Sequence, residues 1–389
     1  MKPDADVYQG STLVAHLQRT DGGTALSFVP GVSLENGFLA SRLPPQAGSL
    51  ETIDLHPFFL NLLPEGARLR LLLEGSRSKD DSLGLLLRLG WDTIGDVAVL
   101  PNGTPPAAPR VSVPGAKLSE VSFWDLFYEG VGEFQDAAVP GVQEKISSSA
   151  VAFGVRLASV PSAILKLNPK AYPRLVQNEE FFLRMATGCG LETCKAVLVQ
   201  DRLGEPGLLV TRFDRVKHGR TLRKLHQEDA CQLLNAVPGN KYSVALRRIA
   251  ETLCQVCTAP VVETERLLKH YAFSFLIGNG DLHAKNISVL WSDAVRLAPA
   301  YDLLSTLPYP VDNHMALPLE GRNDNFRTAD FVAFGLRHGV PERATRSMIA
   351  TLCQRAGPWI ERVGEIGFDA KTTAHLMGEM KERMAKLLR

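Results

Sequence analysis

The sequence lacks long apolar runs and lacks an excess of charge of either sign. No stretch of about 18 consecutive apolar residues occurs in its 389 residues, so we expect no membrane-spanning helix. The 43 lysine and arginine residues nearly balance the 42 aspartate and glutamate residues. The net charge of +1 argues against a wholly basic nucleic-acid-binding protein, although a local basic patch is compatible with this total. The first few residues contain no apolar core, so we expect no signal peptide.

Cysteine is also scarce, with six residues scattered along the chain. Cys254 and Cys257 have the spacing of a metal or redox pair, but no second pair and no histidine lies close by in sequence. They fall in an apolar helical pattern that begins near Val244, so we predict core cysteines in a reduced, cytoplasmic protein. The hydrophobic content of 45% predicts a packed globular protein, long enough for two or three domains.

The most informative segment is residues 278–286, with the sequence GNGDLHAKN. It places Asp281 five positions before Asn286, and Asp302 follows sixteen positions after that asparagine. This is the residue pattern of a kinase-type phosphoryl-transfer site. There, the first aspartate meets the acceptor hydroxyl, while the asparagine and the second aspartate hold Mg²⁺ against the nucleotide phosphates. Hard oxygen ligands suit Mg²⁺, so the sequence predicts a phosphotransferase.

The surroundings of this motif favour the functional interpretation over a simple turn. Aspartate, asparagine and glycine are common in turns, so the motif alone is not specific. However, residues 267–277 are apolar and predict a buried helix that runs into the loop. Residues 287–291 and 295–297 predict two short strands between the loop and Asp302. Loop, hairpin and second aspartate therefore follow in the order that a kinase C-lobe requires.

A kinase also needs a lysine that contacts the phosphates, and Lys166 is the candidate. It lies inside the apolar run 163–167, which predicts a strand. A buried ammonium group needs a partner of opposite charge, and Glu179 or Glu180 in the predicted helix 177–186 is placed to supply it. The alternative is an edge-strand lysine that faces water.

The remaining candidate positions are less specific. Residues 211–215 lie where the hinge between lobes is expected, with an exposed charged turn as the alternative. Lys285, four positions after Asp281, is a candidate to stabilise charge on the transferred phosphoryl group. The segment expected to cover the phosphates lacks the G-x-G-x-x-G pattern of protein kinases and has a single glycine, Gly141. Residues 147–149 are three serines that fit phosphate contacts or modification sites, although plain solvent exposure is the more common case.

We predict an α+β protein with a bilobal protein-kinase-like fold, an extra small N-terminal α+β subdomain and a mostly helical C-lobe. The predicted boundaries are residues 1–110 for the N-terminal subdomain, 111–214 for the N-lobe with its phosphate loop and hinge, and 215–389 for the C-lobe with the catalytic and metal-binding loops. The N-lobe is predicted to contain five strands and one helix. The other elements expected from the pattern are strands at residues 7–16, 25–30 and 95–101, helices at 65–75 and 80–89, and a packed terminal helix at 381–389.

These segments resemble the HipA family of bacterial serine/threonine protein kinases, the toxin component of HipBA toxin–antitoxin modules. The similarity is strongest in residues 280–286 (GDLHAKN) and 301–305 (YDLLS). The supporting segments are residues 59–66 (FLNLLPEG), 95–101 (GDVAVLP), 141–145, 164–167, 178–179, 212–215, 227–229 and 241–242.

The resemblance implies ATP and Mg²⁺ as cofactors and assigns roles to matching positions. Asp281 would be the catalytic base, Asn286 and Asp302 would bind Mg²⁺, and Lys166 would hold the nucleotide phosphates. The residues expected to cover the phosphates are Val139, Pro140, Gly141, Val142, Gln143 and Glu144. The residues expected to form the hinge are Thr211, Arg212 and Phe213. Those expected to line the ATP site are His283, Ala284, Asn286 and Tyr301.

The resemblance also implies partners. Family members phosphorylate a serine of a translation-related protein, glutamyl-tRNA synthetase in the best-known case. They bind a helix-turn-helix antitoxin, HipB, which carries the complex to operator DNA. The serine that the family uses for self-inactivation corresponds to Ala138 here, which puts that control in doubt; the serines at 147–149 are hypothetical substitutes.

Two other functions stay open at this point. One is a small-molecule phosphotransferase, which would not need the N-terminal subdomain. The other is a non-catalytic corepressor that binds the antitoxin, against which the intact Asp281, Asn286, Asp302 and Lys166 argue.

Overall fold

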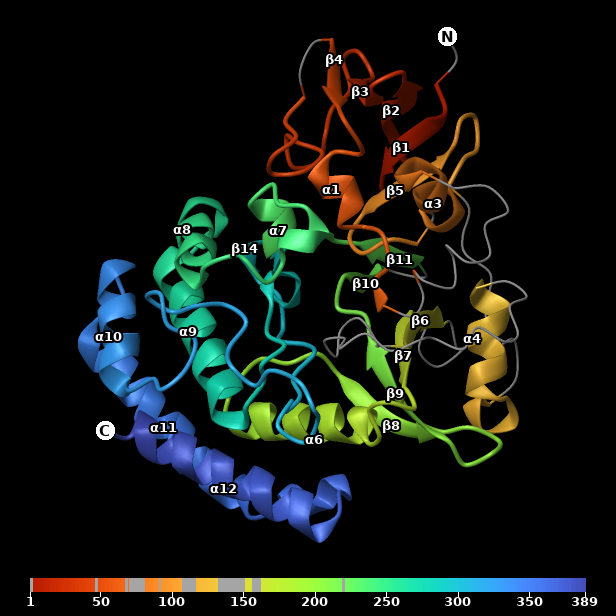
Figure 1. The fold of residues 1–389 in the computed structure, drawn as a ribbon. Helices are drawn as coiled ribbons and strands as arrows, with labels where there is room; N and C mark the ends of the chain where they lie inside the picture. The colour runs from red at the N-terminus through yellow and green to blue at the C-terminus, as the bar shows by residue number, and fades with distance from the viewer. Residues whose placement is uncertain are drawn as a thin grey trace.

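The computed structural model describes residues 3–45, 48–66, 69, 81–90, 92–106, 117–131, 151–155, 162–218 and 221–389. Three regions follow one another along the chain: a small N-terminal sheet with short helices, a second sheet backed by one long helix, and a helical region that ends at the C-terminus (Figure 1).

The N-terminal subdomain is a five-stranded antiparallel sheet with strand order β4-β3-β2-β1-β5. Its strands are β1 (Ala5–Gln9), β2 (Thr12–Thr20), β3 (Gly23–Phe28), β4 (Ser49–Thr52) and β5 (Val97–Pro101). Helices α1 (Pro57–Leu60) and α3 (Ser82–Leu89) contribute Phe58, Phe59 and Leu86 to its buried core. The strand predicted at 7–16 is in fact two strands, because Gly10, at φ +60°, turns the chain between β1 and β2.

The second sheet is antiparallel, and its four strands in the described residues have the order β6-β7-β9-β8. The strands are β6 (Val151–Val155), β7 (Ala163–Leu167), β8 (Ala196–Gln200) and β9 (Pro206–Thr211). In β7, Ala163, Leu165 and Leu167 are buried against α4 (Phe123–Val131), which supplies Phe123 and Phe127. Side chains alternate between the two faces of a strand, so Lys166 projects from the opposite face, toward α6 (Leu175–Gly188).

The helical region is built around α9 (Pro260–Ile277), in which residues 270–277 are all buried. The surrounding helices are α7 (Ala230–Leu233), α8 (Leu246–Val256), α10 (Thr328–Arg337), α11 (Glu342–Ile360) and α12 (Ala370–Leu387). The short helices η1 (Leu118–Glu120), η2 (Pro238–Asn240), η3 (Ala284–Asn286) and η4 (Val363–Ile366) occur in connections. The packed terminal helix is confirmed, since Leu376, Met380 and Leu387 of α12 are buried.

A three-stranded sheet, β12-β13-β14, carries the loop that contains Asp281. Its strands are β12 (His226–Asp229), β13 (Ser288–Trp291) and β14 (Val295–Leu297), and the hairpin β10 (Arg215–His218) and β11 (Thr221–Lys224) precedes it. The helix predicted at 267–277 and both predicted strands are confirmed. Gly278, at φ +67°, ends α9, and a Cβ at this position would lie 2.5 Å from the Leu307 side chain.

All six cysteines are free thiols, and Cys254 is the exposed one. The prediction of core cysteines is therefore confirmed for Cys257 but wrong for Cys254. Among the helices of the described residues, none is both long and apolar enough to cross a membrane.

Candidate active site

The loop after α9 holds Asp281 from several sides. The Tyr242 hydroxyl donates a hydrogen bond of 2.8 Å to Asp281 Oδ1. The Asp281 backbone N–H donates to Asn279 Oδ1 at 3.1 Å, and Asn286 Nδ2 donates to the Asp281 carbonyl at 3.0 Å. Asp281 and Asn286 are both buried. The loop therefore presents its carboxylate in a fixed orientation.

Asn279 connects the two acidic segments, a role that sequence analysis missed. Its Oδ1 accepts from the Asp281 N–H, and its Nδ2 donates to the Asp302 carbonyl at 3.3 Å. One fully buried amide thus spans the backbones of Asp281 and Asp302. The available signal was its place between two glycines at the end of an apolar helix, which identifies a turn but not a bridge.

Lys166 lies between two carboxylates. Its Nζ is 2.7 Å from Glu179 Oε1 and also contacts Asp302 Oδ1. Burial alone would lower the pKa of Lys166, but the Asp302 and Glu179 carboxylates raise it above its ordinary value. The partner in α6 is therefore Glu179, whereas Glu180 pairs with Arg184 at 2.7 Å. The alternative of an edge-strand lysine facing water is wrong.

Asp302 has the donor chemistry and the setting that a magnesium ligand requires. Its backbone is left-handed, with φ +53°, a conformation that aspartate adopts more easily than most residues. Its side chain is 36% exposed and faces Lys166. The described residues contain no cluster of three or more histidine, cysteine, aspartate or glutamate side chains that could hold a metal ion. Mg²⁺ commonly takes one or two protein oxygens together with phosphates and waters, so Asp302 and the Asn286 amide oxygen fit this ion.

Tyr301 joins the loop to the hinge region. Its hydroxyl donates to the Lys285 carbonyl at 2.7 Å and lies 2.6 Å from Ser288 Oγ. Burial raises the pKa of Tyr301 well above its ordinary value. Its ring centroid lies 5.7 Å from that of Phe213. The structure thus brings together two residues predicted for the nucleotide pocket from segments far apart in sequence.

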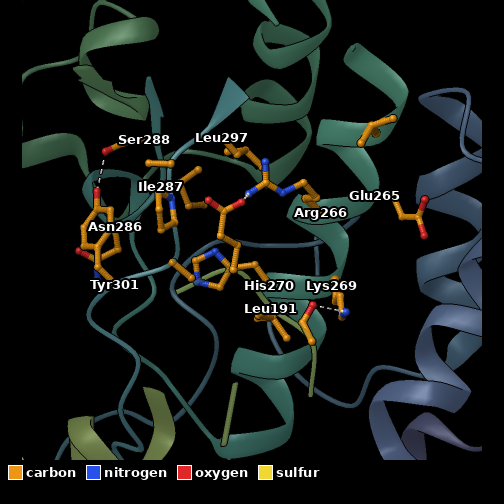
Figure 2. Close-up of a pocket in the computed structure, with 16 residues that line it drawn as sticks. Leu191, Glu265, Arg266, Lys269, His270, Asn286, Ile287, Ser288, Leu297 and Tyr301 are labelled. Atoms are coloured by element: carbon orange, nitrogen blue, oxygen red, sulfur yellow. Dashed lines mark hydrogen bonds and ion pairs between the residues drawn. The ribbon is translucent and has the colours of Figure 1, made fainter. Parts of the chain in front are cut away.

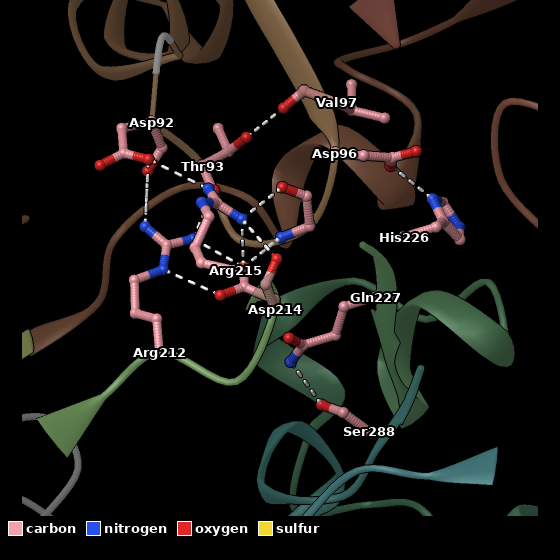
Figure 3. A network of polar contacts seen from close by, with 11 residues as sticks. Asp92, Thr93, Asp96, Val97, Arg212, Asp214, Arg215, His226, Gln227 and Ser288 are labelled. Atoms are coloured by element: carbon pink, nitrogen blue, oxygen red, sulfur yellow. Dashed lines mark hydrogen bonds and ion pairs between the residues drawn. The ribbon is translucent and has the colours of Figure 1, made fainter. Parts of the chain in front are cut away.

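The predicted hinge is tightly bonded within the fold. The backbone N–H groups of Thr211 and Arg212 donate to the carbonyls of Lys195 and Ser162. The Arg212 side chain is buried with Asp214, Arg215 and the N-terminal subdomain (Figure 3). The alternative of an exposed charged turn is therefore wrong, because the N-terminal subdomain covers it.

The three residues that lead to Asn286 make their own contacts. His283 is buried, and its ring lies edge-on to Tyr242 with centroids 5.1 Å apart. The Ala284 N–H donates to the Lys241 carbonyl at 3.0 Å. Lys285 Nζ donates to Asn61 of the N-terminal subdomain at 2.9 Å. The residues predicted to cover the phosphates (Val139, Pro140, Gly141, Val142, Gln143 and Glu144), together with Ala138 and the serines at 147–149, lie outside the described residues.

A cavity of about 330 Å³ lies next to this site (Figure 2). It shares Asn286 and Tyr301 with the site, but most of its other lining residues come from α9 and from residues 190–192 and 297–300. Buried His270 lines it, and desolvation lowers the pKa of this residue to about 4. Asp281, Asp302 and Lys166 do not line this cavity, so it is distinct from the acidic corner where phosphates are expected.

The paired lysine and glutamate, the two aspartates and the intervening asparagine on this fold define an enzyme of the protein kinase class. Sequence comparison gives the family. Residues 5–100 match the HipA N-terminal domain, and residues 137–360, more than half of the chain, match the HipA-like C-terminal domain. The chain belongs to the HipA family of serine/threonine kinases.

Individual relatives agree with this assignment. A protein of Sinorhizobium fredii named "Putative kinase Y4mE" is 28% identical over 90% of this chain and 89% of its own length. The serine/threonine-protein kinase toxin HipA of Shewanella oneidensis is 27% identical over 82% of this chain and 80% of its own length. A solved complex of Shewanella oneidensis HipA, HipB and operator DNA contains a chain that matches with a TM-score of 0.79 at 21% identity, covering 99% of this chain and 97% of that one. The predicted α+β, kinase-like fold is thereby confirmed.

Proposed function

We propose that this chain is a toxin kinase that uses ATP and Mg²⁺ to phosphorylate a serine of a translation-related protein, such as glutamyl-tRNA synthetase. A HipB-like helix-turn-helix antitoxin would neutralise it and carry the complex to operator DNA. The single observation that supports the catalytic part is the Asn279 bridge between Asp281 and Asp302, the residues that we propose to face the acceptor and to bind the metal. The likeness to the Shewanella toxin and its complex supports the partners.

The roles follow from the contacts. Asp281, oriented by Tyr242, would accept the proton of the acceptor hydroxyl, and Lys166, aligned by Glu179, would hold the nucleotide phosphates. Asn286 and Asp302 would hold Mg²⁺, which supplies positive charge against the phosphate oxygens. Lys285 would add positive charge near the transferred group. Phe213 and Tyr301 would flank the nucleotide base, with Thr211, Arg212, His283 and Ala284 around it. Residues Val139–Glu144 would close over the phosphates. We place the activity in the cytoplasm, because all six cysteines are free thiols.

The test is transfer of radiolabelled phosphate from ATP into cell lysate. Asp281→Ala should lower the rate by roughly 10²–10⁴-fold, the range for loss of a general base. Asp302→Ala should do at least as much and should abolish the Mg²⁺-dependent thermal shift with ATP. Both variants should stay folded. Near-wild-type transfer by either variant would contradict the assignment.

A parallel assay with small alcohols separates the alternatives. Labelling of alcohols but not of lysate protein would indicate a small-molecule phosphotransferase. ATP binding without transfer to either acceptor would indicate a non-catalytic corepressor.

A further inference from the structure

The end of α1 reaches from the N-terminal subdomain to the catalytic loop. Lys285 Nζ donates to the Asn61 carbonyl at 2.9 Å and to Asn61 Oδ1 at 3.1 Å. It also lies 3.5 Å from Glu65 and 3.6 Å from Asp229. The ammonium group of a catalytic-loop residue is therefore bound by two oxygens of a different subdomain, 224 positions away in sequence.

Asn61 is held in the orientation that this contact needs. Its Nδ2 donates to the Pro57 carbonyl at 2.8 Å and to the Ala236 carbonyl at 2.9 Å. These two acceptors fix which side of the amide carries the nitrogen, so Oδ1 faces Lys285. The side chain is buried, and α1 lies against α7 at this point (Figure 1). A preoriented buried amide locates its partner more sharply than a mobile surface group does.

Glu65 makes a second contact with the same loop. The Glu65 carboxylate contacts the Nζ atoms of both Lys285 and Lys241. The backbone carbonyl of Lys241 accepts from the Ala284 N–H, and the next residue, Tyr242, donates to Asp281. The segment containing Asn61 and Glu65 thus contacts the loop directly at Lys285 and indirectly at Asp281.

We propose that Asn61 is a positioning residue for phosphoryl transfer, which fixes Lys285 so that the N-terminal subdomain completes the kinase active site; this rests on the proposed function. Asn61 is neutral, so it orients the ammonium group without cancelling its charge. The Glu65 carboxylate, 3.5 Å away, contacts the same ammonium group. The subdomain is then part of the catalytic apparatus as well as an attachment to it.

A double-mutant cycle tests this proposal in the full chain. Asn61→Ala should lower kcat roughly tenfold, the effect of losing one charge-assisted hydrogen bond, with a smaller change in KM for ATP. Lys285→Met should lower kcat at least as much. In the Lys285→Met background, Asn61→Ala should have no further effect on kcat, because the interaction is already absent.

The matched control is Ser41→Ala. It removes a hydroxyl that donates to Glu228 at 2.9 Å in the same contact between subdomain and kinase region, but it does not touch the loop. Its kcat should equal that of the wild type. If Asn61→Ala does not fold, Glu65→Gln replaces it in the cycle. Because Glu65 also binds Lys241, its effect on kcat should shrink but not vanish in the Lys285→Met background.

Three results would overturn the proposal: unchanged kcat in Lys285→Met, unchanged kcat in the tested variant of Asn61 or Glu65, or an equal fold-loss in both backgrounds. Failure of the proposed function gives a different result, because Asp281→Ala would then transfer phosphate as fast as the wild type.

Discussion

Two clusters of acidic and basic side chains in the described residues differ in their balance of charge and in their exposure. Around the hinge, Arg212 and Arg215 are paired with Asp214 and Asp92, and the first three side chains are only 6%, 2% and 4% exposed. At the acidic corner of the candidate active site, Lys166 meets the two carboxylates of Glu179 and Asp302. There, the lysine side chain is 20% exposed and that of Asp302 is 36% exposed.

The difference separates a cluster that joins two parts of the fold from the proposed nucleotide site. The hinge cluster has equal numbers of opposite charges, and backbone groups of the N-terminal subdomain complete its hydrogen bonds. Gly95 N–H donates to Asp214, and the Thr93 carbonyl accepts from both arginines (Figure 3). Because its charges and hydrogen bonds are matched within the fold, this cluster has few groups left to bind a ligand. The acidic corner has one more negative charge than positive and opens to solvent, so a cation carrying phosphates would complete it.

The largest expected effect comes from unbalancing the hinge cluster. Burial alone would raise the pKa of Asp214, but Arg212 and Arg215 lower it below its ordinary value. Asp214→Ala would leave two buried guanidinium groups short of a partner and should lower the free energy of unfolding by about 3–5 kcal/mol. Urea denaturation measures this.

The control for that experiment is Asp125→Ala, which breaks an exposed pair with Arg202 and should cost less than about 1 kcal/mol. If Asp214→Ala lowers the free energy of unfolding no more than Asp125→Ala does, the hinge cluster does not stabilise the contact with the N-terminal subdomain.

His226 also links the kinase region to the N-terminal subdomain, and the strength of this link depends on pH. Its Nδ1 lies 2.7 Å from Asp96 and its Nε2 lies 3.0 Å from Glu228. Burial alone would lower the pKa of His226, but these carboxylates raise it to about 10. Since the unfolded value is about 6.5, this stabilisation is complete below that pH and is lost as the pH rises through about 10. The urea concentration at the denaturation midpoint should decrease as the pH is raised from 6 to 9.5. The variant His226→Gln should make this decrease smaller. An identical slope in the variant would remove His226 as its source.

The smallest effects come from the two adjacent glutamates of α6, which sharpen the contrast at the acidic corner. Glu179→Gln weakens the pairing of Lys166 and should lower kcat/KM roughly 10-fold to 100-fold, as expected for a hydrogen bond between charged groups of about 1.5–3 kcal/mol. Glu180→Gln breaks only a surface pair with Arg184 and should cost about 0.3–0.5 kcal/mol of stability with no change in rate. Equal rates in the two variants would contradict the assignment of Glu179.

The sequence predicted the parts of the site that are local. The spacing of Asp281, Asn286 and Asp302, together with the apolar segments around them, placed these residues on a loop and beyond a hairpin, and the structure has that order of elements. It left Glu179 and Glu180 as alternatives, because neighbouring helix positions differ by about 100° and only the packing of α6 selects one. It gave no role to Tyr242 or Asn279, whose partners depend on how distant segments meet.

Local chemistry and periodicity, which depend on neighbours along the chain, determined the kinase motif, the helix before it and the strand that carries Lys166. Only the tertiary structure decided that Arg212 is buried and that Asn61 reaches Lys285. The physical reason is that burial and hydrogen-bond partners are set by contacts between segments far apart in sequence. A single sequence records which groups need partners but not where those partners lie.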